Sequence, residues 1–135
     1  MNELIIAAET KHLDEVLSFV DEVLKKYNCP TDTQIKIDIA VEEIYVNIAN
    51  YAYNPEVGEA TIICRVENEP LRVIVEFRDG GVSYNPLETE EPNIELSAEE
   101  RDMGGLGIYM VKSSMDNVAY RYENGKNILT IEKNL

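Results

Sequence analysis

The sequence is short of cysteines and of long apolar runs, and each shortage excludes a class of protein. Cys29 and Cys64 are the only cysteines among 135 residues, so a disulfide framework and a cysteine-based metal cluster are both excluded. No apolar stretch approaches the roughly 20 residues that cross a bilayer, and no basic segment followed by an apolar one opens the chain. We therefore expect a cytoplasmic protein without a membrane partner.

Basic residues are also scarce, since 12 Lys and Arg stand against 26 Asp and Glu, for a net charge of −14 at pH 7. This charge repels phosphate backbones and anionic lipid headgroups, which disfavours binding to nucleic acid or to a membrane surface. A ligand that carries phosphate would therefore have to be held by backbone N–H groups and a divalent cation more than by Lys and Arg.

Hydrophobic periodicity predicts the element order β-α-α-β-β-loop-α-β-β in a single domain, residues 1–135. Because helices and strands do not alternate, this order favours an α/β (α+β) two-layer sandwich, with a mixed, mostly antiparallel sheet of about five strands and three helices on one face. The predicted strands are 2–8, 59–67, 71–79, 117–123 and 126–132. The predicted helices run from Thr10 to Tyr27, from an N-cap at Thr31 or Asp32 to about Tyr53, and from Leu106 to about Met115.

A polar stripe on the second predicted helix is the first indication of a site. Apolar residues occupy two nearly opposite faces of this helix, which predicts that other elements cover both. Glu43 and Asn47, four residues apart, project side by side from the stripe between these faces. A carboxylate can take up a proton and a carboxamide oxygen suits Mg²⁺. The alternative is that both cap backbone groups or face solvent.

The strand predicted at 71–79 brings a carboxylate to the edge of the core. Apolar and charged residues alternate from Leu71 to Phe77, and Asp79 continues the apolar face. A charge in that position needs a specific donor. Two glycines follow, the second of them Gly81, and they allow a flat ligand with an exocyclic amine to approach closely. The alternative is that Asp79 accepts N–H groups of its own turn.

Glycines also open the third predicted helix, where Gly104, Gly105 and Gly107 flank Leu106. Such a start leaves backbone N–H groups unobstructed, and the helix dipole adds to their attraction for an anion. The alternative is a tight junction between loop and helix that binds nothing. The pattern is neither a Walker loop nor a dinucleotide-binding fingerprint.

Taken together and in this order, the three segments resemble the Bergerat-fold ATPases, the superfamily of histidine kinases and gyrase. They look most like the bacterial anti-sigma-factor serine/threonine kinases. The resemblance runs from the first helix to the final hairpin and departs from the usual pattern at Tyr51 and Ser83. Its motifs are EEIYVNIANYAY at 42–53, DGGVSYNPL at 79–87 and GGLGIYMV at 104–111.

The resemblance implies a role for each motif. Glu43 would be the general base and Asn47 would bind Mg²⁺, while Asp79 would bind the adenine amine of ATP and Gly81 would let the base seat. A lid at about 83–103 would cover the phosphates. The remaining nucleotide-binding residues that it implies are Asn50, Tyr84, Arg101, Gly104, Gly105, Leu106 and Gly107. For Arg101, neutralisation of its acidic neighbours is the alternative.

The activity implied is that of an ATP-dependent protein serine/threonine kinase of the anti-sigma-factor type. Such a protein phosphorylates an anti-sigma antagonist protein, restrains a sigma factor and acts as a homodimer. The alternative is a non-catalytic switch, in which ATP or ADP only sets the affinity for a partner protein. A third possibility is an interaction domain that binds no nucleotide.

Overall fold

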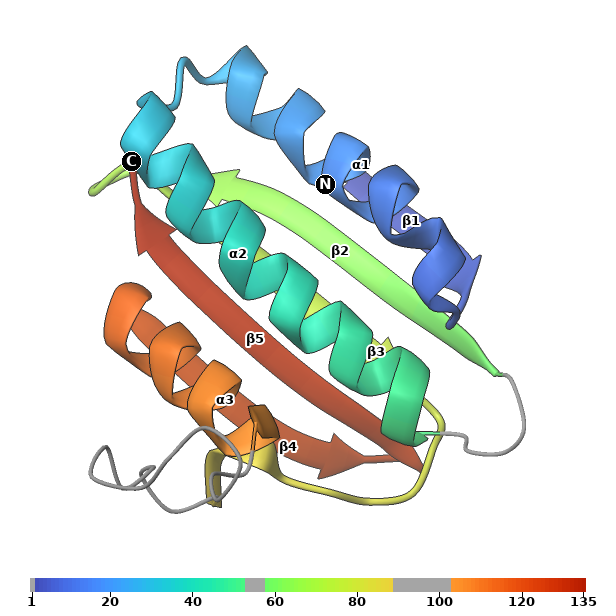
Figure 1. Cartoon of the computed structure of the whole chain (residues 1–135). Coiled ribbons are helices and arrows are strands. Elements are labelled where there is room, and N and C mark those ends of the chain that lie inside the picture. The colour runs from blue at the N-terminus through green and yellow to red at the C-terminus, as the bar shows by residue number, and fades with distance from the viewer. Residues whose placement is uncertain (1, 53–57, 89–102) are drawn as a thin grey trace.

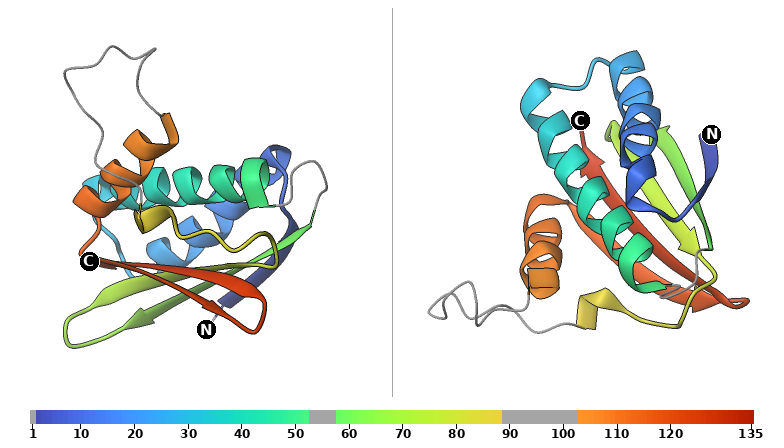
Figure 2. Two further views of the ribbon diagram at one scale, coloured as in Figure 1. Left: turned by 90° about the horizontal axis from the view of Figure 1, so that it is seen from below. Right: turned by 45° about the vertical axis from the view of Figure 1, so that its right-hand side comes forward.

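The computed structural model describes residues 2–52, 58–88 and 103–135, and it forms two layers (Figure 1). A five-stranded sheet has the order β1-β2-β3-β5-β4, with every neighbouring pair antiparallel. The helices lie together on one face of this sheet (Figure 2). The predicted α+β sandwich is thus confirmed. The elements are β1 Asn2–Ala7, α1 Leu13–Lys26, α2 Thr31–Asn47, β2 Glu59–Glu67, β3 Arg72–Asp79, α3 Met103–Ser114, β4 Asn117–Glu123 and β5 Lys126–Asn134.

The core lies between the helices and the sheet, and α2 supplies much of it. Ile37, Val41 and Ile44 on α2 are buried against the sheet. The side chain of Tyr45 is fully buried, and its hydroxyl lies 2.9 Å from the carbonyl oxygen of Ala7 and 2.7 Å from that of Glu9. One buried hydroxyl therefore ties α2 to the segment that joins β1 to α1.

The strands follow the predicted alternation closely, and the last hairpin turns as its sequence requires. Asn124 and Gly125 both have positive φ, at 54° and 76°, as a type I′ turn demands. On β3, Val73, Val75 and Phe77 face the core as predicted. The alternation therefore predicted correctly which residues of β3 face the helices.

Two predicted helix starts are wrong. The N-cap of α2 is Pro30, with no side-chain cap bond, so Thr31 and Asp32 lie inside the first turn, where an acidic side chain still favours the helix dipole. Helix α3 begins at Met103 and not at Leu106. Glycine lowers helix propensity and hid this start, but packing of the following turns outweighs that local preference.

Helix α2 changes character directly after Asn47, where it continues as a π-helix over Ile48–Ala52. Tyr53, where the helix was predicted to end, lies outside the described residues. Single π-helical turns are rare and occur often at functional sites. Here the turn lies at the end of α2 that approaches the loop after β3, since Val82 N–H donates to the carbonyl oxygen of Ala52 at 3.1 Å.

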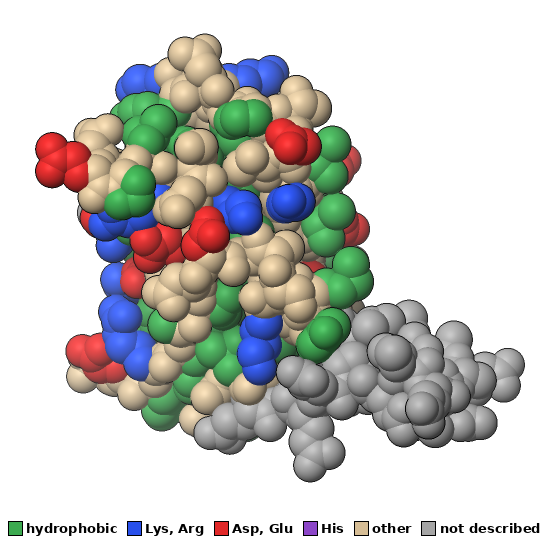
Figure 3. All heavy atoms as spheres, turned by 90° about the vertical axis from the view of Figure 1, so that its left-hand side faces the viewer, with side chains coloured by type: hydrophobic (Ala, Val, Ile, Leu, Met, Phe, Trp, Pro, Cys, Tyr) green, Lys and Arg blue, Asp and Glu red, His purple; other side chains and the backbone are tan. Residues whose placement is uncertain are grey.

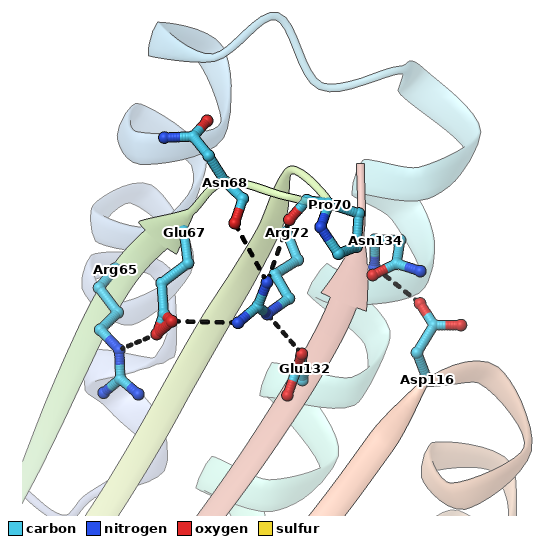
Figure 4. Close-up of polar contacts among 8 residues, drawn as sticks. All are labelled: Arg65, Glu67, Asn68, Pro70, Arg72, Asp116, Glu132 and Asn134. Atoms are coloured by element: carbon cyan, nitrogen blue, oxygen red, sulfur yellow. Dashed lines mark hydrogen bonds and ion pairs between the residues drawn. The ribbon is translucent and has the colours of Figure 1, made fainter.

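The face of the sheet opposite the helices carries ion pairs. Arg72 contacts Glu132 at 2.7 Å and Glu67 at 3.1 Å, and Arg65 contacts Glu67 at 3.4 Å (Figure 4). Seen from the side of α3, acidic and basic side chains are interspersed with hydrophobic ones (Figure 3). In the part of the chain that the structure describes, no helix has the length and apolar character of a membrane span.

Candidate functional site

A cavity of about 530 Å³ opens between α2 with its π-helical end, the end of β3 with the loop that follows it, the middle of α3 and strands β4 and β5. Asn47 and Asp79, which the sequence predicts to share a site, both line it. Two segments 32 positions apart in the numbering are thus brought to one space, as proposed from the polar stripe and the strand end. The other lining residues are Ile44, Ile48, Ala52, Phe77, Val82, Ser83, Tyr84, Pro86, Ile108, Tyr120, Asn127 and Leu129.

Asp79 is the last residue of β3, and only 6% of its surface is exposed. Its Oδ1 accepts two hydrogen bonds, from Gly81 N–H and from the Asn127 side chain, each 3.0 Å long. Acceptance from its own turn, the alternative considered for Asp79, therefore does occur. Both bonds end on Oδ1 and neither uses Oδ2, so the same carboxylate can serve the turn and the cavity.

Glu43 lies beside Asn47 and against the backbone of α3. Asn47 Nδ2 donates to Glu43 Oε1 at 3.4 Å, and a Cβ built on Gly107 would lie 1.9 Å from the same oxygen. Burial raises the pKa of the Glu43 carboxyl, the bond from Asn47 opposes this rise, and the charge of Glu42 adds to it. Glu43 is therefore placed next to the cavity as a carboxylate of increased basicity.

The donor set around Asn47 fits a hard divalent cation. Because Nδ2 of Asn47 is directed to Glu43, its Oδ1 is left as a neutral oxygen ligand of the kind that Mg²⁺ accepts. Within residues 2–52, 58–88 and 103–135, no cluster of three or more His, Cys, Asp or Glu side chains is arranged to hold a metal. An ion held here would therefore take its other oxygens from a bound ligand and from water.

Gly81 is in close contact with the π-helix. A Cβ at this position would lie 2.2 Å from the carbonyl oxygen of Ala52 and 2.7 Å from its Cβ. The glycine thus allows the loop after β3 to approach the end of α2, and the cavity wall is formed where they meet.

The other predicted residues are distributed unevenly around the cavity. Tyr84 lines it although 61% of its surface is exposed. Asn50 lies on the π-helix, is exposed and is not one of the lining residues. Gly104, Gly105 and Leu106 belong to the first turns of α3. Arg101 and the segment 89–102 of the predicted lid lie outside the described residues.

One site residue, Asn127, was missed by the sequence analysis. It is 7% exposed, lines the cavity and stands directly opposite Asp79 in the pairing of β3 with β5. The signal that revealed Asp79 was available for it too: Asn127 begins the apolar face that Leu129 and Ile131 continue. The rule that identified Asp79, a polar residue on the core face of a strand, therefore applies equally to Asn127 on β5.

One protein family and several known proteins are similar to this chain. The family described as "Histidine kinase-like ATPase domain" matches residues 6–133. A protein of Bacillus mycoides (strain KBAB4) named "Serine-protein kinase RsbW" is 26% identical, over 94% of this chain and 81% of its own length. Its namesake in Bacillus cereus (strain ATCC 10987 / NRS 248) has the same identity and coverage. The solved structure of Acinetobacter baumannii histidine kinase AdeS has a TM-score of 0.46 and 14% identity, over 99% of this chain and 68% of that one.

Proposed function

The chain belongs to the histidine kinase-like ATPase domain family, and from this premise we propose that it is an ATP-dependent protein serine/threonine kinase. The observation that carries the proposal is a single cavity that Asn47 and Asp79 both line, with the Glu43 carboxylate beside Asn47. Along one bound nucleotide, Asp79 would then accept a hydrogen bond from the purine, Asn47 would bind the metal ion and Glu43 would accept the proton.

The part of the cavity around Asp79 suits adenine. Its volume of about 530 Å³ lies within the range of small-molecule sites. Phe77, Ile108 and Leu129 supply apolar surface for a flat base. Asp79 offers carboxylate oxygens, which accept hydrogen bonds and therefore pair with the amino group of adenine and not with the 6-oxo group of guanine.

The N-terminal part of α3, where Gly107 packs against Glu43, suits the triphosphate. The first turns of α3, with Gly104, Gly105, Leu106 and Gly107, would direct backbone N–H groups and the positive end of the helix dipole towards phosphate oxygens. Asn47 would hold Mg²⁺ through Oδ1, and the bound ion supplies charge neutralisation for those oxygens. With this arrangement, a chain that has few Lys and Arg residues would still bind the phosphates.

Phosphate transfer needs a base at the incoming hydroxyl. Glu43 would accept the proton of a serine or threonine hydroxyl. As it does so, the hydroxyl oxygen bonds to the γ-phosphorus, and the bond between that phosphorus and the leaving oxygen of ADP breaks. Its increased pKa, caused first by burial, makes it a better proton acceptor than an exposed carboxylate. The serine kinases named among the relatives support a hydroxyl acceptor.

The resemblance to anti-sigma-factor kinases gives the proposed partners. The substrate would be an anti-sigma antagonist protein, a sigma factor would be restrained by the same chain, and the active form would be a homodimer in the cytoplasm. These partners are proposed from the resemblance, whereas the nucleotide site rests on the cavity.

The kinase activity is tested with labelled ATP and candidate antagonist proteins. We expect Glu43→Gln to lower phosphate transfer by about 10²-fold or more, because it removes the general base. Glu42→Gln is the matched control, since Glu42 is the adjacent exposed carboxylate. Equal and very low transfer by the wild type and Glu43→Gln would leave only the ATP-dependent binding switch.

Nucleotide binding is tested separately by calorimetric titration with Mg-ATP and Mg-ADP. Asp79→Asn exchanges an acceptor for a group that also donates, and we expect affinity to fall by roughly 10- to 100-fold, the worth of a hydrogen bond to a charged group. Undiminished affinity in this variant would remove Asp79 from the site.

A further inference from the structure

The side chain of Asn127 uses its whole hydrogen-bonding capacity within the protein. Nδ2 donates to Asp79 Oδ1 at 3.0 Å and to the carbonyl oxygen of Val82 at 2.9 Å, with the carbonyl oxygen of Gly81 at 3.5 Å. Oδ1 accepts from Tyr84 N–H at 3.1 Å and from the Tyr120 hydroxyl at 2.5 Å. A carboxamide has two hydrogens and two lone pairs, and all four are used.

The backbone partners fix which end of the carboxamide faces Asp79. The Tyr84 N–H can only donate, so it must meet the oxygen of Asn127, and the Val82 carbonyl can only accept, so it must meet the nitrogen. The nitrogen is then also the atom that meets Asp79. Asn127 therefore always presents a donor to this carboxylate, and a rotation of the amide would break several bonds at once.

This donor has a consequence for the carboxylate of Asp79. With Asn127 and Gly81 both bonded to Oδ1, the carboxylate is held in one rotation about its Cβ–Cγ bond. Resting on the proposed function, we infer that Asn127 is a positioning residue that sets the selectivity of the pocket for a 6-aminopurine. It acts by fixing Oδ2 of Asp79 as the acceptor for the amino group.

Asn127 acts through Asp79 and does not bind the nucleotide itself, since its own donors and acceptors are already used. It also joins β5 to the loop after β3, which supplies Val82 and Tyr84 to the cavity wall. A role limited to holding this wall would change the affinity for every nucleotide equally. A role in orienting Asp79 changes the preference for the amino group, and the two can be separated by measurement.

The test compares Mg-ATP with the triphosphate of purine riboside, which lacks the 6-amino group, by calorimetric titration. We expect the wild type to prefer ATP, and Asn127→Ala to lower this preference by about tenfold, in line with the loss of one hydrogen bond to a charged group. Tyr120→Phe removes only the hydroxyl that bonds Oδ1 of Asn127, so it keeps the fold and should lower the preference in the same direction by a smaller factor. Asn134→Ala, an exposed asparagine of the same strand, is the control and should keep the wild-type ratio.

Each possible result either supports or overturns the positioning role of Asn127. If Asn127→Ala and Tyr120→Phe keep the full preference for ATP, or if Asn127→Ala weakens both ligands by the same factor, the positioning role is overturned while the proposed ATP site stands. A wild type that binds both triphosphates equally overturns the role of Asp79 and of Asn127 together. A wild type that binds neither triphosphate overturns the proposed function itself.

Discussion

The carboxylate of Glu43 is packed against the backbone of Gly107, so closely that a Cβ on this glycine would lie 1.9 Å from Oε1 and 2.1 Å from Cδ. The contact joins α2 to α3 at the point where the proposed base meets the proposed phosphate-binding helix. A glycine inside a helix normally reduces stability. Here the close approach of a carboxylate explains why the helix has a glycine at this position.

The first prediction is that Gly107→Ala is harmful although it places alanine in a helix. An alanine there usually stabilises by up to about 1 kcal/mol. We expect the methyl group to displace the Glu43 carboxylate, which is the flexible end of a side chain, so that most of this gain in stability is lost and phosphotransfer falls by about tenfold or more. Urea denaturation measures the stability, and a phosphotransfer assay measures the displacement of the base. In a Glu43→Ala background the same substitution should give the full gain in stability. An equal change of stability in both backgrounds would contradict the contact.

The second prediction concerns Gly81, where the obstacle is backbone and cannot move aside. A Cβ would lie 2.2 Å from the carbonyl oxygen of Ala52, so Gly81→Ala should cost about 2–3 kcal/mol and weaken ATP binding, because it separates the loop from the π-helix. Gly125→Ala is the contrasting variant, since nothing lies within 4 Å of a Cβ there and only its φ of +76° is unfavourable. We expect it to cost about 1 kcal/mol without an effect on binding. Equal losses of affinity would contradict this distinction.

The third prediction concerns the hydroxyl of Tyr45. In Tyr45→Phe, the N–H and the carbonyl oxygen of Glu9 both lose their bond to this hydroxyl. Both groups keep a backbone partner, since Glu9 N–H also donates to the carbonyl oxygen of Ala7 and the carbonyl oxygen of Glu9 also accepts from His12 N–H. We therefore expect the free energy of unfolding to fall by about 1 kcal/mol, the usual contribution of a hydrogen bond. Tyr122→Phe, an exposed tyrosine that is 49% accessible, should change stability little. If the two variants unfold at the same urea concentration, the hydroxyl is not a tie between α2 and the β1–α1 segment.

The fourth prediction is a pH dependence that arises between α1 and α2. The pKa of Asp38 is raised from 3.8 to about 7, first by burial and then by the hydrogen bond and the charge of Asp21. The folded protein therefore holds this proton more tightly than the unfolded chain does. The stabilisation is full below about pH 4 and is lost as the pH rises through about 7.

Asp38→Asn removes this titration and keeps a donor for Asp21. We expect it to be more stable than the wild type at pH 8, by on the order of 1 kcal/mol, and to approach the wild type as the pH falls towards 4. Denaturation curves from pH 4 to 8 measure the difference. Glu22→Gln, at an exposed position on α1, should follow the wild-type profile. Parallel profiles for Asp38→Asn and the wild type would show that the pair does not titrate in this range.

Local pattern predicted most of the fold because strand alternation and helical spacing record which side chains must leave water. Val73, Val75 and Phe77 show this on β3. The helix starts were harder to predict. Helix α2 begins after Pro30 without a side-chain cap, and at α3 tertiary packing outweighs the low propensity of the glycines. Neither effect has a signature within a few residues of sequence.

The candidate site was predicted where its residues lie within a motif. Asn47 and Asp79 were found in this way, and the structure brings both to one cavity. Asn127 was not, since its importance comes from the register that sets β5 against β3. The packing of Glu43 on Gly107 likewise depends on how α2 and α3 meet in space. Such relations between distant segments are properties of the assembled fold.

The central place of β3 has a consequence for how the protein would exchange its ligand. Every residue from Arg72 to Asp79 is paired with β2 on one side and with β5 on the other. Strands bonded along both edges are among the last to open during spontaneous fluctuations, and their amide hydrogens exchange with deuterium most slowly. If the proposed site is correct, nucleotides would therefore leave and return many times while Asp79, at the end of this strand, keeps its position.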